Sequence, residues 1–226
     1  GKTTNTQNIT IDTPITIAGP ISVYGGDITI NENIDTTGAA NGANGDVLVD
    51  ASGGITLAEG KSVVTAGGDI TFDAQSTILM DGASGAKAVI DAAGGNIDVS
   101  STVASGAVAR AVLFEFAEVK TSGAGTITIF GDATNSSNTT DLAWGVSLIG
   151  DAGSSALIQS EHGVISITGV GGVSSNNSRG IGVDGRDFKV LSSSGAITLT
   201  DSRAVGRNSY SGMYLRPATG GSGILF

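Results

Sequence analysis

The apolar residues of this chain recur in short units, in which two β-branched or leucine-like side chains flank one polar or small residue. Such period-2 alternation is typical of short β-strands with one buried face. No stretch keeps the i, i+3, i+4, i+7 spacing of an amphipathic helix. The sequence therefore predicts an all-β fold. The units lie at Ile9–Ile11, Ile15–Ile17, Ile28–Ile30, Val47–Val49, Ile55–Leu57, Ile70–Phe72, Ile97–Val99, Ile127–Ile129, Ile165–Ile167 and Ile197–Leu199.

Glycines stand immediately before many of these units or one residue away from them, as in Gly25-Gly26, Gly67-Gly68 and Gly94-Gly95. Because glycine adopts positive φ at little cost, we expect these glycines to form sharp corners between strands. Intervals of 42, 27, 30, 38 and 32 residues separate the glycine-preceded strands that begin at Ile28, Ile70, Ile97, Ile127, Ile165 and Ile197. A repeat of about 30 residues is the signature of a solenoid. The coil register between residues 46 and 68 stays open, because extra strand units fall there.

Two β architectures compete for this pattern. A sandwich or meander needs two-residue hairpin turns and strands of about five or six residues. Here the units are shorter, the glycine corners recur at a long period, and each interval has room for two further strands, as at Ile78–Met80 and Val89–Ile90. A parallel β-helix with three short strands per coil is therefore favoured. About seven coils fit the chain, which makes a rod of roughly 35 Å at ~4.8 Å per coil.

Composition and charge exclude several classes of protein. The 226 residues carry a net charge of −10, which argues against nucleic acid or an anionic membrane as partner. The absence of cysteine excludes disulfides, thiolate metal sites and a cysteine nucleophile. No apolar run approaches the roughly 18 residues that a membrane helix needs. We expect no cofactor, no bound metal and no membrane insertion.

The Gly-Gly-Asp-Ile-Thr-Ile unit at 25–30 and the Gly-Gly-Asn-Ile-Asp-Val unit at 94–99, with Ile34–Gly38 and Val47–Ala51 between them, carry a family resemblance. They resemble the repeats of filamentous-haemagglutinin-like bacterial exoproteins, over most of residues 9 to 130. The resemblance implies a right-handed parallel β-helix, export to the surface of a Gram-negative cell, and service as an adhesin shaft. The Asn-Pro-Asn-containing export motifs of that family are absent.

The chain ends lead us to expect a single β-helix segment, 1–226, that belongs to a longer chain or assembly. Strand units start at Ile9, and the sequence stops on an apolar run at 223–226 without a polar cap. Terminal coils of a β-helix expose unpaired backbone groups unless something covers them. End-to-end self-association of copies is therefore one expected kind of contact.

Three motifs offer catalytic, metal or nucleotide chemistry, and each has a structural interpretation that we favour. His162, the one histidine, is expected to be a solvated corner residue, because no pair of adjacent aspartates accompanies it as acid–base chemistry would need. Corner acids such as Asp27 and Asp69 are expected to accept backbone N–H bonds rather than to bind calcium. The stretch 180–185 matches a dinucleotide fingerprint, but no helix is predicted after it.

Charge is distributed unevenly along the chain. Residues 1–178 hold 18 acids and 5 bases, whereas 179–226 hold 3 acids and 6 bases. Loop insertions are expected in the same half, at 131–144, 170–180 and 201–212, and each precedes a similar apolar strand. If these strands stack in one ladder, the loops lie on one side of the rod, where long loops usually carry binding. The candidate binding residues are Trp144, Asn177, Arg179, Arg203, Arg207, Tyr210 and Tyr214.

Three functions remain open. The first is a non-enzymatic structural or adhesive segment of a secreted bacterial cell-surface protein, with a host or neighbouring-cell surface, glycans included, as partner. The second is a carbohydrate-active β-helix enzyme, a polysaccharide hydrolase or lyase, which requires carboxylates that converge in one groove. The third is a self-assembling extracellular filament subunit, in which the acidic start of one copy meets the basic end of the next.

Overall fold

The structure is a computed structural model that describes residues 4–38, 45–137, 143–151, 156–173, 178–185, 188–203, 213–217 and 224–225. Every regular element in these ranges is a β-strand, which confirms the all-β prediction. Over the same ranges no helix is long and apolar enough to cross a bilayer.

The described residues form three parallel sheets, which we name sheets A, B and C. Sheet A contains β1 (Ile9–Ile11), β4 (Ile28–Ile30), β7 (Ile55–Leu57), β10 (Ile78–Asp81), β13 (Arg110–Glu115), β16 (Ala143–Gly150), β19 (Ser178–Gly185) and β22 (Met213–Pro217). Sheet B contains β2 (Ile15–Thr16), β5 (Ile34–Asp35), β8 (Ser62–Val64), β11 (Ala88–Asp91), β14 (Ala117–Thr121), β17 (Leu157–Ser160), β20 (Phe188–Ser192) and β23 (Ile224–Leu225). Sheet C contains β3 (Ile21–Gly25), β6 (Val47–Ala51), β9 (Ile70–Ala74), β12 (Ile97–Thr102), β15 (Ile127–Asp132), β18 (Ile165–Gly171) and β21 (Ile197–Arg203).

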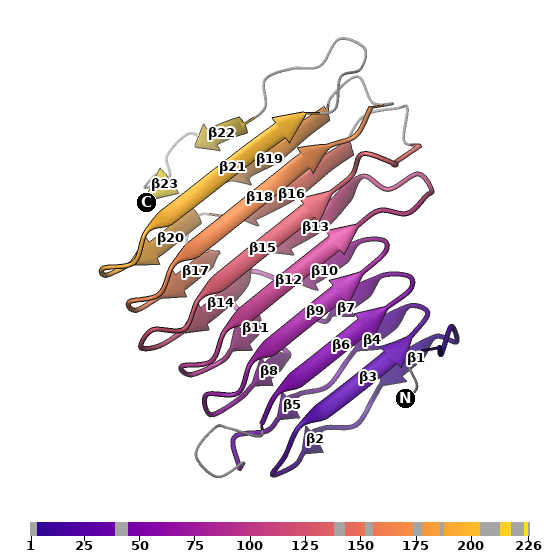
Figure 1. Ribbon diagram of the computed structural model, residues 1–226, viewed down its shortest axis with the longest axis vertical. Helices are drawn as coiled ribbons and strands as arrows, with labels where there is room; N and C mark the ends of the chain where they lie inside the picture. The colour runs from indigo at the N-terminus through magenta and orange to yellow at the C-terminus, as the bar shows by residue number, and fades with distance from the viewer. Residues whose placement is uncertain are drawn as a thin grey trace.

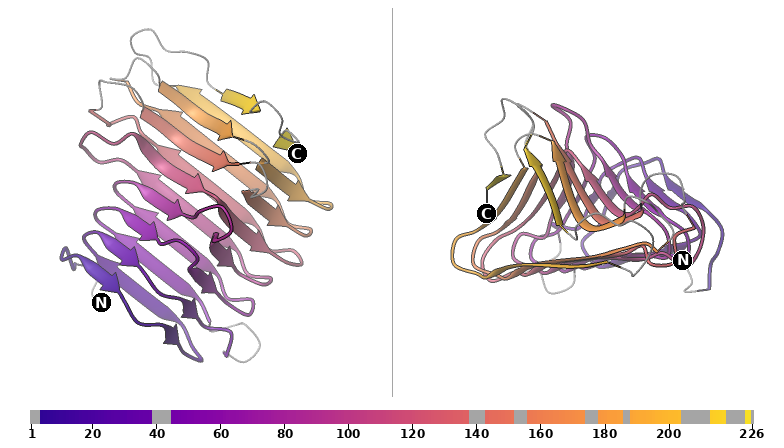
Figure 2. Two further views of the ribbon diagram at one scale, coloured as in Figure 1. Left: turned by 180° about the vertical axis from the view of Figure 1, so that it is seen from behind. Right: turned by 90° about the horizontal axis from the view of Figure 1, so that it is seen from above.

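The chain passes through sheets A, B and C in turn, and each circuit is one coil of a right-handed parallel β-helix. Strands of one sheet run side by side in one direction, from β3 to β21 on the near face of Figure 1. Seen from above, the three sheets enclose a triangular section (Figure 2). Seven complete coils are followed by β22 and β23, so the predicted coil count and three strands per coil are confirmed.

Alternate side chains of each strand point inward and stack on their equivalents in the next coil. On sheet A one such ladder runs through every coil, and its members between β4 and β19 are almost fully buried. Each β-branched or leucine side chain is buried against its equivalents in the coils before and after it, and this burial is the main source of stability in such a solenoid. The ladder consists of Ile9, Ile28, Ile55, Ile78, Val112, Val146, Ile181 and Met213.

The corner glycines are needed for two different reasons, and the sequence prediction recognised only one. Gly67, Gly94 and Gly123 have the expected positive φ, of 100°, 118° and 55°. The prediction of positive φ was wrong for Gly25 and for the second glycine of each corner. At these second glycines a Cβ would collide with backbone of the coil below: at Gly95 it would lie 2.5 Å from the Gly68 carbonyl carbon. Gly68, Gly95, Gly125, Gly163 and Gly195 form this glycine stack.

Hydroxyl side chains reinforce the glycine stack from inside the corner. The Thr65 hydroxyl donates to the Gly68 carbonyl at 2.6 Å, and the Thr121 hydroxyl donates to the Gly95 carbonyl at 2.7 Å. Ser160 makes the equivalent bond to Gly125 at 2.7 Å. These buried hydroxyls satisfy carbonyl groups that lie at the bend, where buried polar groups need partners.

The open register between residues 46 and 68 is settled by the strand pairing. Val47 pairs with Ile21 on one side and with Ile70 on the other, so β6 belongs to sheet C and completes a coil. Ile28, in contrast, pairs with Ile55 in sheet A. The 42-residue interval from Ile28 to Ile70 is therefore not one coil, because Ile28 lies in sheet A and Ile70 lies in sheet C.

Strands in the second half extend further than the three or four residues that the sequence suggested. β15 ends at Asp132, β18 ends at Gly171 and β16 begins at Ala143, so both ends of the expected insertions 131–144 and 170–180 are strand. Residues 201–203 likewise belong to β21. The parallel ladder continues because backbone groups beyond the apolar unit still find partners in the neighbouring coil.

Candidate functional site

The strands that follow the expected insertions do stack in one ladder, which was the condition for placing the loops on one side. Val146 pairs with Ile181, and Ile181 pairs with Met213, so β16, β19 and β22 are neighbours in sheet A. Arg203 is the last residue of β21 and Tyr214 lies in β22. Asn177, Arg207 and Tyr210 lie outside the described residues.

Trp144 and Arg179 come together, but not as an exposed recognition surface. They are register partners in β16 and β19, and the Arg179 guanidinium carbon lies 4.8 Å from the Trp144 ring centroid. Arg110, in register on the other side, lies 5.5 Å from the same ring. Trp144 is only 3% exposed. Two cations on one desolvated indole make a stabilising contact across three coils.

Gly182 shows where the Trp144 ring lies. A Cβ on Gly182 would meet the Cε3 and Cζ3 atoms of the ring, and its strand neighbours Ile181 and Val183 point into the core. The ring therefore covers the outer face of sheet A. This explains the fingerprint match at 180–185, which is strand β19 and not a phosphate loop. Arg110 was missed because only the coil register, and no motif, places it beside Trp144.

The corner acids cap backbone N–H groups, as the sequence analysis expected. Asp27 Oδ1 accepts a bond from Gly54 N at 2.8 Å, and Asp69 Oδ1 accepts one from Asn96 N at 2.7 Å. Asp46 Oδ1 likewise accepts from Asp69 N at 2.9 Å. In the part of the chain that the structure describes, no three His, Cys, Asp or Glu side chains are grouped so that they could hold a metal ion.

His162 is a solvated corner residue, which also confirms the expectation. Its Nδ1 lies 3.1 Å from the Ser194 hydroxyl, and its Nε2 lies 3.6 Å from Glu161 Oε1. The side chains of His162 and Glu161 are 54% and 53% exposed. Solvent screens contacts of this kind, so the geometry does not activate the serine.

Three aspartates gather on the outer face of sheet C, a cluster that the sequence analysis did not identify. Asp50 and Asp73 are register partners in β6 and β9, and Asp98 lies on the adjacent β12. Partial burial raises the pKa of Asp73, and the charges of Asp50 and Asp98 raise it further. Partial burial also raises the pKa of Asp98. Period-2 alternation placed each aspartate outward, but their proximity depended on the register.

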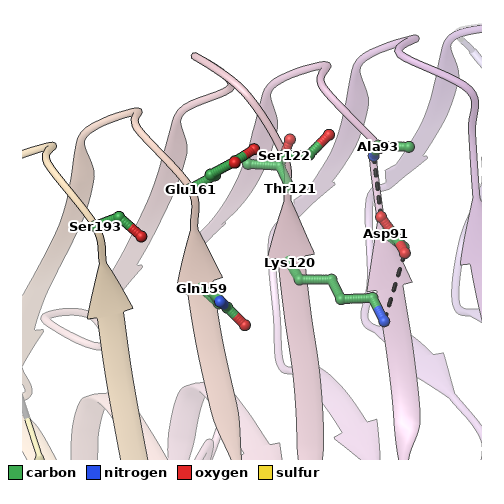
Figure 3. Close-up of a pocket in the computed structure, with 8 residues that line it drawn as sticks. All are labelled: Asp91, Ala93, Lys120, Thr121, Ser122, Gln159, Glu161 and Ser193. Atoms are coloured by element: carbon green, nitrogen blue, oxygen red, sulfur yellow. Dashed lines mark hydrogen bonds and ion pairs between the residues drawn. The ribbon is translucent and has the colours of Figure 1, made fainter.

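A concavity lined mainly by polar residues lies over the ends of the sheet B strands, and we call it the sheet B groove. Its volume is about 500 Å³. Asp91, Lys120 and Gln159 line it from the successive strands β11, β14 and β17, and the corners beyond the strands close one side (Figure 3). The remaining lining residues are Ala93, Thr121, Ser122, Glu161 and Ser193.

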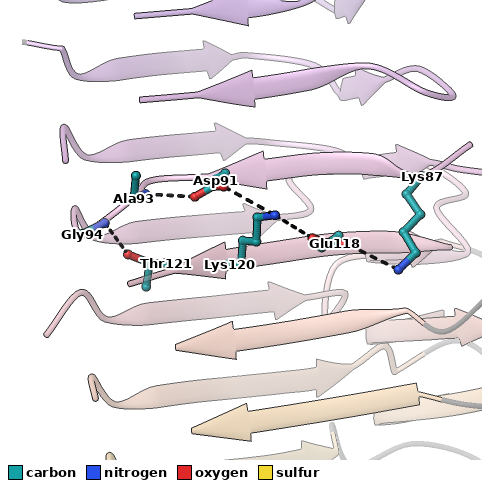
Figure 4. A network of polar contacts seen from close by, with 7 residues as sticks. All are labelled: Lys87, Asp91, Ala93, Gly94, Glu118, Lys120 and Thr121. Atoms are coloured by element: carbon teal, nitrogen blue, oxygen red, sulfur yellow. Dashed lines mark hydrogen bonds and ion pairs between the residues drawn. The ribbon is translucent and has the colours of Figure 1, made fainter. Parts of the chain in front are cut away.

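An ion network holds the floor of the sheet B groove in place (Figure 4). The Lys120 ammonium lies 2.8 Å from Glu118 Oε1 and 3.5 Å from Asp91 Oδ2, and Lys87 Nζ lies 3.3 Å from Glu118 Oε2. The hydrogen bond to Glu118 raises the pKa of Lys120, although partial burial opposes this. Partial burial disfavours the Glu118 carboxylate, but Lys120 and Lys87 overcome it and lower the pKa of Glu118. Glu118 and Lys120 are therefore both ionised at neutral pH.

One residue at the rim of the sheet B groove has an unusual backbone conformation. Ala93 has φ of 45°, a region that side chains with a Cβ rarely occupy. Its N–H donates to Asp91 Oδ1 at 3.0 Å, which fixes the turn that follows β11. The Asp91 carboxylate thus connects the turn to Lys120 and gives the groove a rigid edge.

Comparison with protein-family models, with curated proteins and with solved structures finds no match for this chain. The parallel β-helix is the part of the predicted resemblance that the structure supports.

Proposed function

We propose that this chain is a non-enzymatic structural and adhesive segment of a secreted bacterial cell-surface protein of the filamentous-haemagglutinin-like type. The observation that carries the proposal is the unbroken register of all three sheets from the first coil to the last. In such a rod every coil is held to the next by backbone hydrogen bonds and by the apolar ladders. Its mechanical role is to keep contact residues at a fixed distance from an anchoring point.

The physical basis of this role is resistance to bending. A bend would open the hydrogen bonds of at least one sheet and separate the buried ladders on that side, and the triangular section leaves no direction without a sheet. The Arg110–Trp144–Arg179 contact adds a side-chain connection across three coils of sheet A. Stiffness in this account is a property of the fold, and contact specificity is a property of particular outward side chains.

Two measurements test the proposal. Antibodies raised against the purified chain should label intact cells of the organism that makes it, and should not require lysis. Beads coated with the chain should adhere to epithelial monolayers at least several-fold more than beads coated with albumin. Labelling only after lysis, or adhesion no greater than that of albumin beads, would contradict the proposal.

The aspartate cluster on sheet C favours one second candidate, a carbohydrate-active enzyme. A carboxyl group with raised pKa beside an ionised one is the arrangement by which glycosidases divide the acid and base roles. Asp73, between Asp50 and Asp98, would be the acid. Release of reducing ends from a polysaccharide panel, lost in Asp73→Asn and kept in Glu59→Gln, would support this candidate. Equal rates in both variants would remove it.

A further inference from the structure

We propose that the sheet B groove binds a neutral oligosaccharide whose chain lies along the rod axis. The inference deepens the proposed function and rests on it for its biological role, since it assigns adhesion to a definite site. That site differs from the Trp144 and Arg179 region that the sequence favoured, where Trp144 is buried.

The shape of the groove suits an extended ligand. Its volume of about 500 Å³ falls within the ~300–1,000 Å³ of ordinary small-molecule sites. Asp91 pairs with Lys120, and Lys120 pairs with Gln159, so the groove presents one polar side chain per strand. Neighbouring strands lie ~4.8 Å apart, which is close to the length of one sugar unit in an extended chain. Successive sugar units would therefore meet successive side chains.

The groove also offers unused hydrogen-bonding capacity of mixed kind. Among the described residues, the side chains of Gln159, Ser122 and Ser193 have no hydrogen-bond partner, although all three line the groove. The Gln159 amide supplies both donors and acceptors, as each serine hydroxyl does. Lys120 has three N–H donors, of which Glu118 and Asp91 occupy two. Sugar hydroxyls, which donate and accept, can satisfy such a mixture.

Charge and backbone pairing disfavour other ligands. Asp91 and Glu161 outnumber the one lysine in the lining, and the chain carries a net charge of −10, so acidic glycans and acidic peptides are repelled. A peptide cannot add as a strand, because β11, β14, β17 and β20 are already paired with one another.

No aromatic ring is among the eight residues that line the sheet B groove, so no sugar can stack on a ring there. Affinity should therefore be weak, with a Kd of about 1 mM.

The test is saturation-transfer NMR on the whole chain, titrated with cellohexaose, maltohexaose, chitohexaose and hexagalacturonate. At least one of the three neutral oligosaccharides should bind with a Kd of about 1 mM, and hexagalacturonate should bind more weakly than that one. Gln159→Met keeps side-chain size but removes the amide, and should weaken binding about tenfold. Gln75→Met, at an exposed corner outside the groove, is the matched control and should leave the Kd unchanged.

Three results would overturn the inference: no saturation transfer from any neutral oligosaccharide at about 10 mM, preferential binding of hexagalacturonate, or equal loss of binding in the two glutamine variants. Bead adhesion distinguishes this failure from failure of the proposed function. Adhesion without oligosaccharide binding would refute the groove alone. Oligosaccharide binding without adhesion would refute the adhesive function and leave the groove in place.

Discussion

Replacement of Gly95 by alanine should destabilise the protein severely, although Gly95 does not have the positive φ that favours glycine. Gly95 lies in the glycine stack between Gly68 and Gly125. An added Cβ would lie 2.5 Å from the Gly68 carbonyl carbon and 2.9 Å from the Gly67 carbonyl oxygen. These are backbone atoms, so neither neighbour can rotate away as a flexible side chain would.

The magnitude follows from what must move. Overpacking in a well-packed site costs about 1–3 kcal/mol. Separating the two coils also strains the bonds from Asn96 N to Asp69 Oδ1, at 2.7 Å, and from Ile70 N to Asn96 O, at 2.9 Å. Each such hydrogen bond contributes about 0.5–1.5 kcal/mol. We therefore expect Gly95→Ala to cost roughly 2–6 kcal/mol in all.

Two other glycines provide controls. Gly94 has φ of 118°, and a Cβ added there would meet only the Ser122 hydroxyl oxygen, at 3.8 Å, so Gly94→Ala should cost about 1–2 kcal/mol through backbone strain alone. A Cβ added at Gly19 would meet nothing within 4 Å, and Gly19 has no positive φ, so Gly19→Ala should be neutral or stabilising by up to about 1 kcal/mol. The assay is urea unfolding followed by circular dichroism, with hydrogen exchange to locate the weakened coils.

The order of the three variants is the decisive result. Exchange in Gly95→Ala should increase first in β9 and β12, the strands that meet at this corner. If Gly95→Ala lost no more stability than Gly94→Ala, positive φ and not coil-to-coil contact would be the reason for the corner glycines, and the stacking argument would be refuted.

Three further substitutions test the side-chain contacts. Trp144→Ala should lower the free energy of unfolding by about 3–5 kcal/mol, because it removes a buried ring and both cation contacts. Asp73→Asn should raise the free energy of unfolding by about 0.5 kcal/mol or less at pH 7, because the raised pKa of Asp73 means that the folded state resists its ionisation. This gain should vanish as pH falls below about 4, where the Asp73 carboxyl is protonated in both states. Glu118→Gln should lower the free energy of unfolding by about 1 kcal/mol at pH 7, because the lowered pKa of Glu118 reflects stabilisation of its carboxylate by Lys120 and Lys87. This loss should disappear as pH falls below about 4, where the carboxyl is protonated. Urea titrations at several pH values measure all three effects.

The outcomes that would contradict these expectations differ. Trp144→Phe keeps a ring and should recover much of the loss, so equal losses in the alanine and phenylalanine variants would argue against ring–cation contacts. The exposed turn residue Glu59 provides the control for the two acids, and Glu59→Gln should change stability little at any pH. Destabilisation by Asp73→Asn at neutral pH would show that the Asp73 charge is favourably paired, which is the opposite of the expected effect.

The candidate sites were much harder to predict than the fold. Trp144 and Arg179 were singled out as residue types common in recognition, and the register does bring them together, yet Trp144 is buried and Arg179 is only partly exposed. The sheet B groove was not predicted, since Asp91, Lys120 and Gln159 belong to no motif. Their relation depends on which coil each strand joins, and loops of unequal length between strands conceal that assignment.

What the sequence determined by itself is the repeating local structure: period-2 units such as Ile28–Ile30, the bends before them, and the capping role of corner acids such as Asp69. These depend on residues that are close together in the chain. Only the tertiary structure decided which strands stack, where Gly95 has no room for a side chain, and which outward side chains share a groove. The reason is physical: such contacts join atoms about one coil apart, and the number of residues per coil varies, as from Val47 to Ile70 and from Ile127 to Ile165.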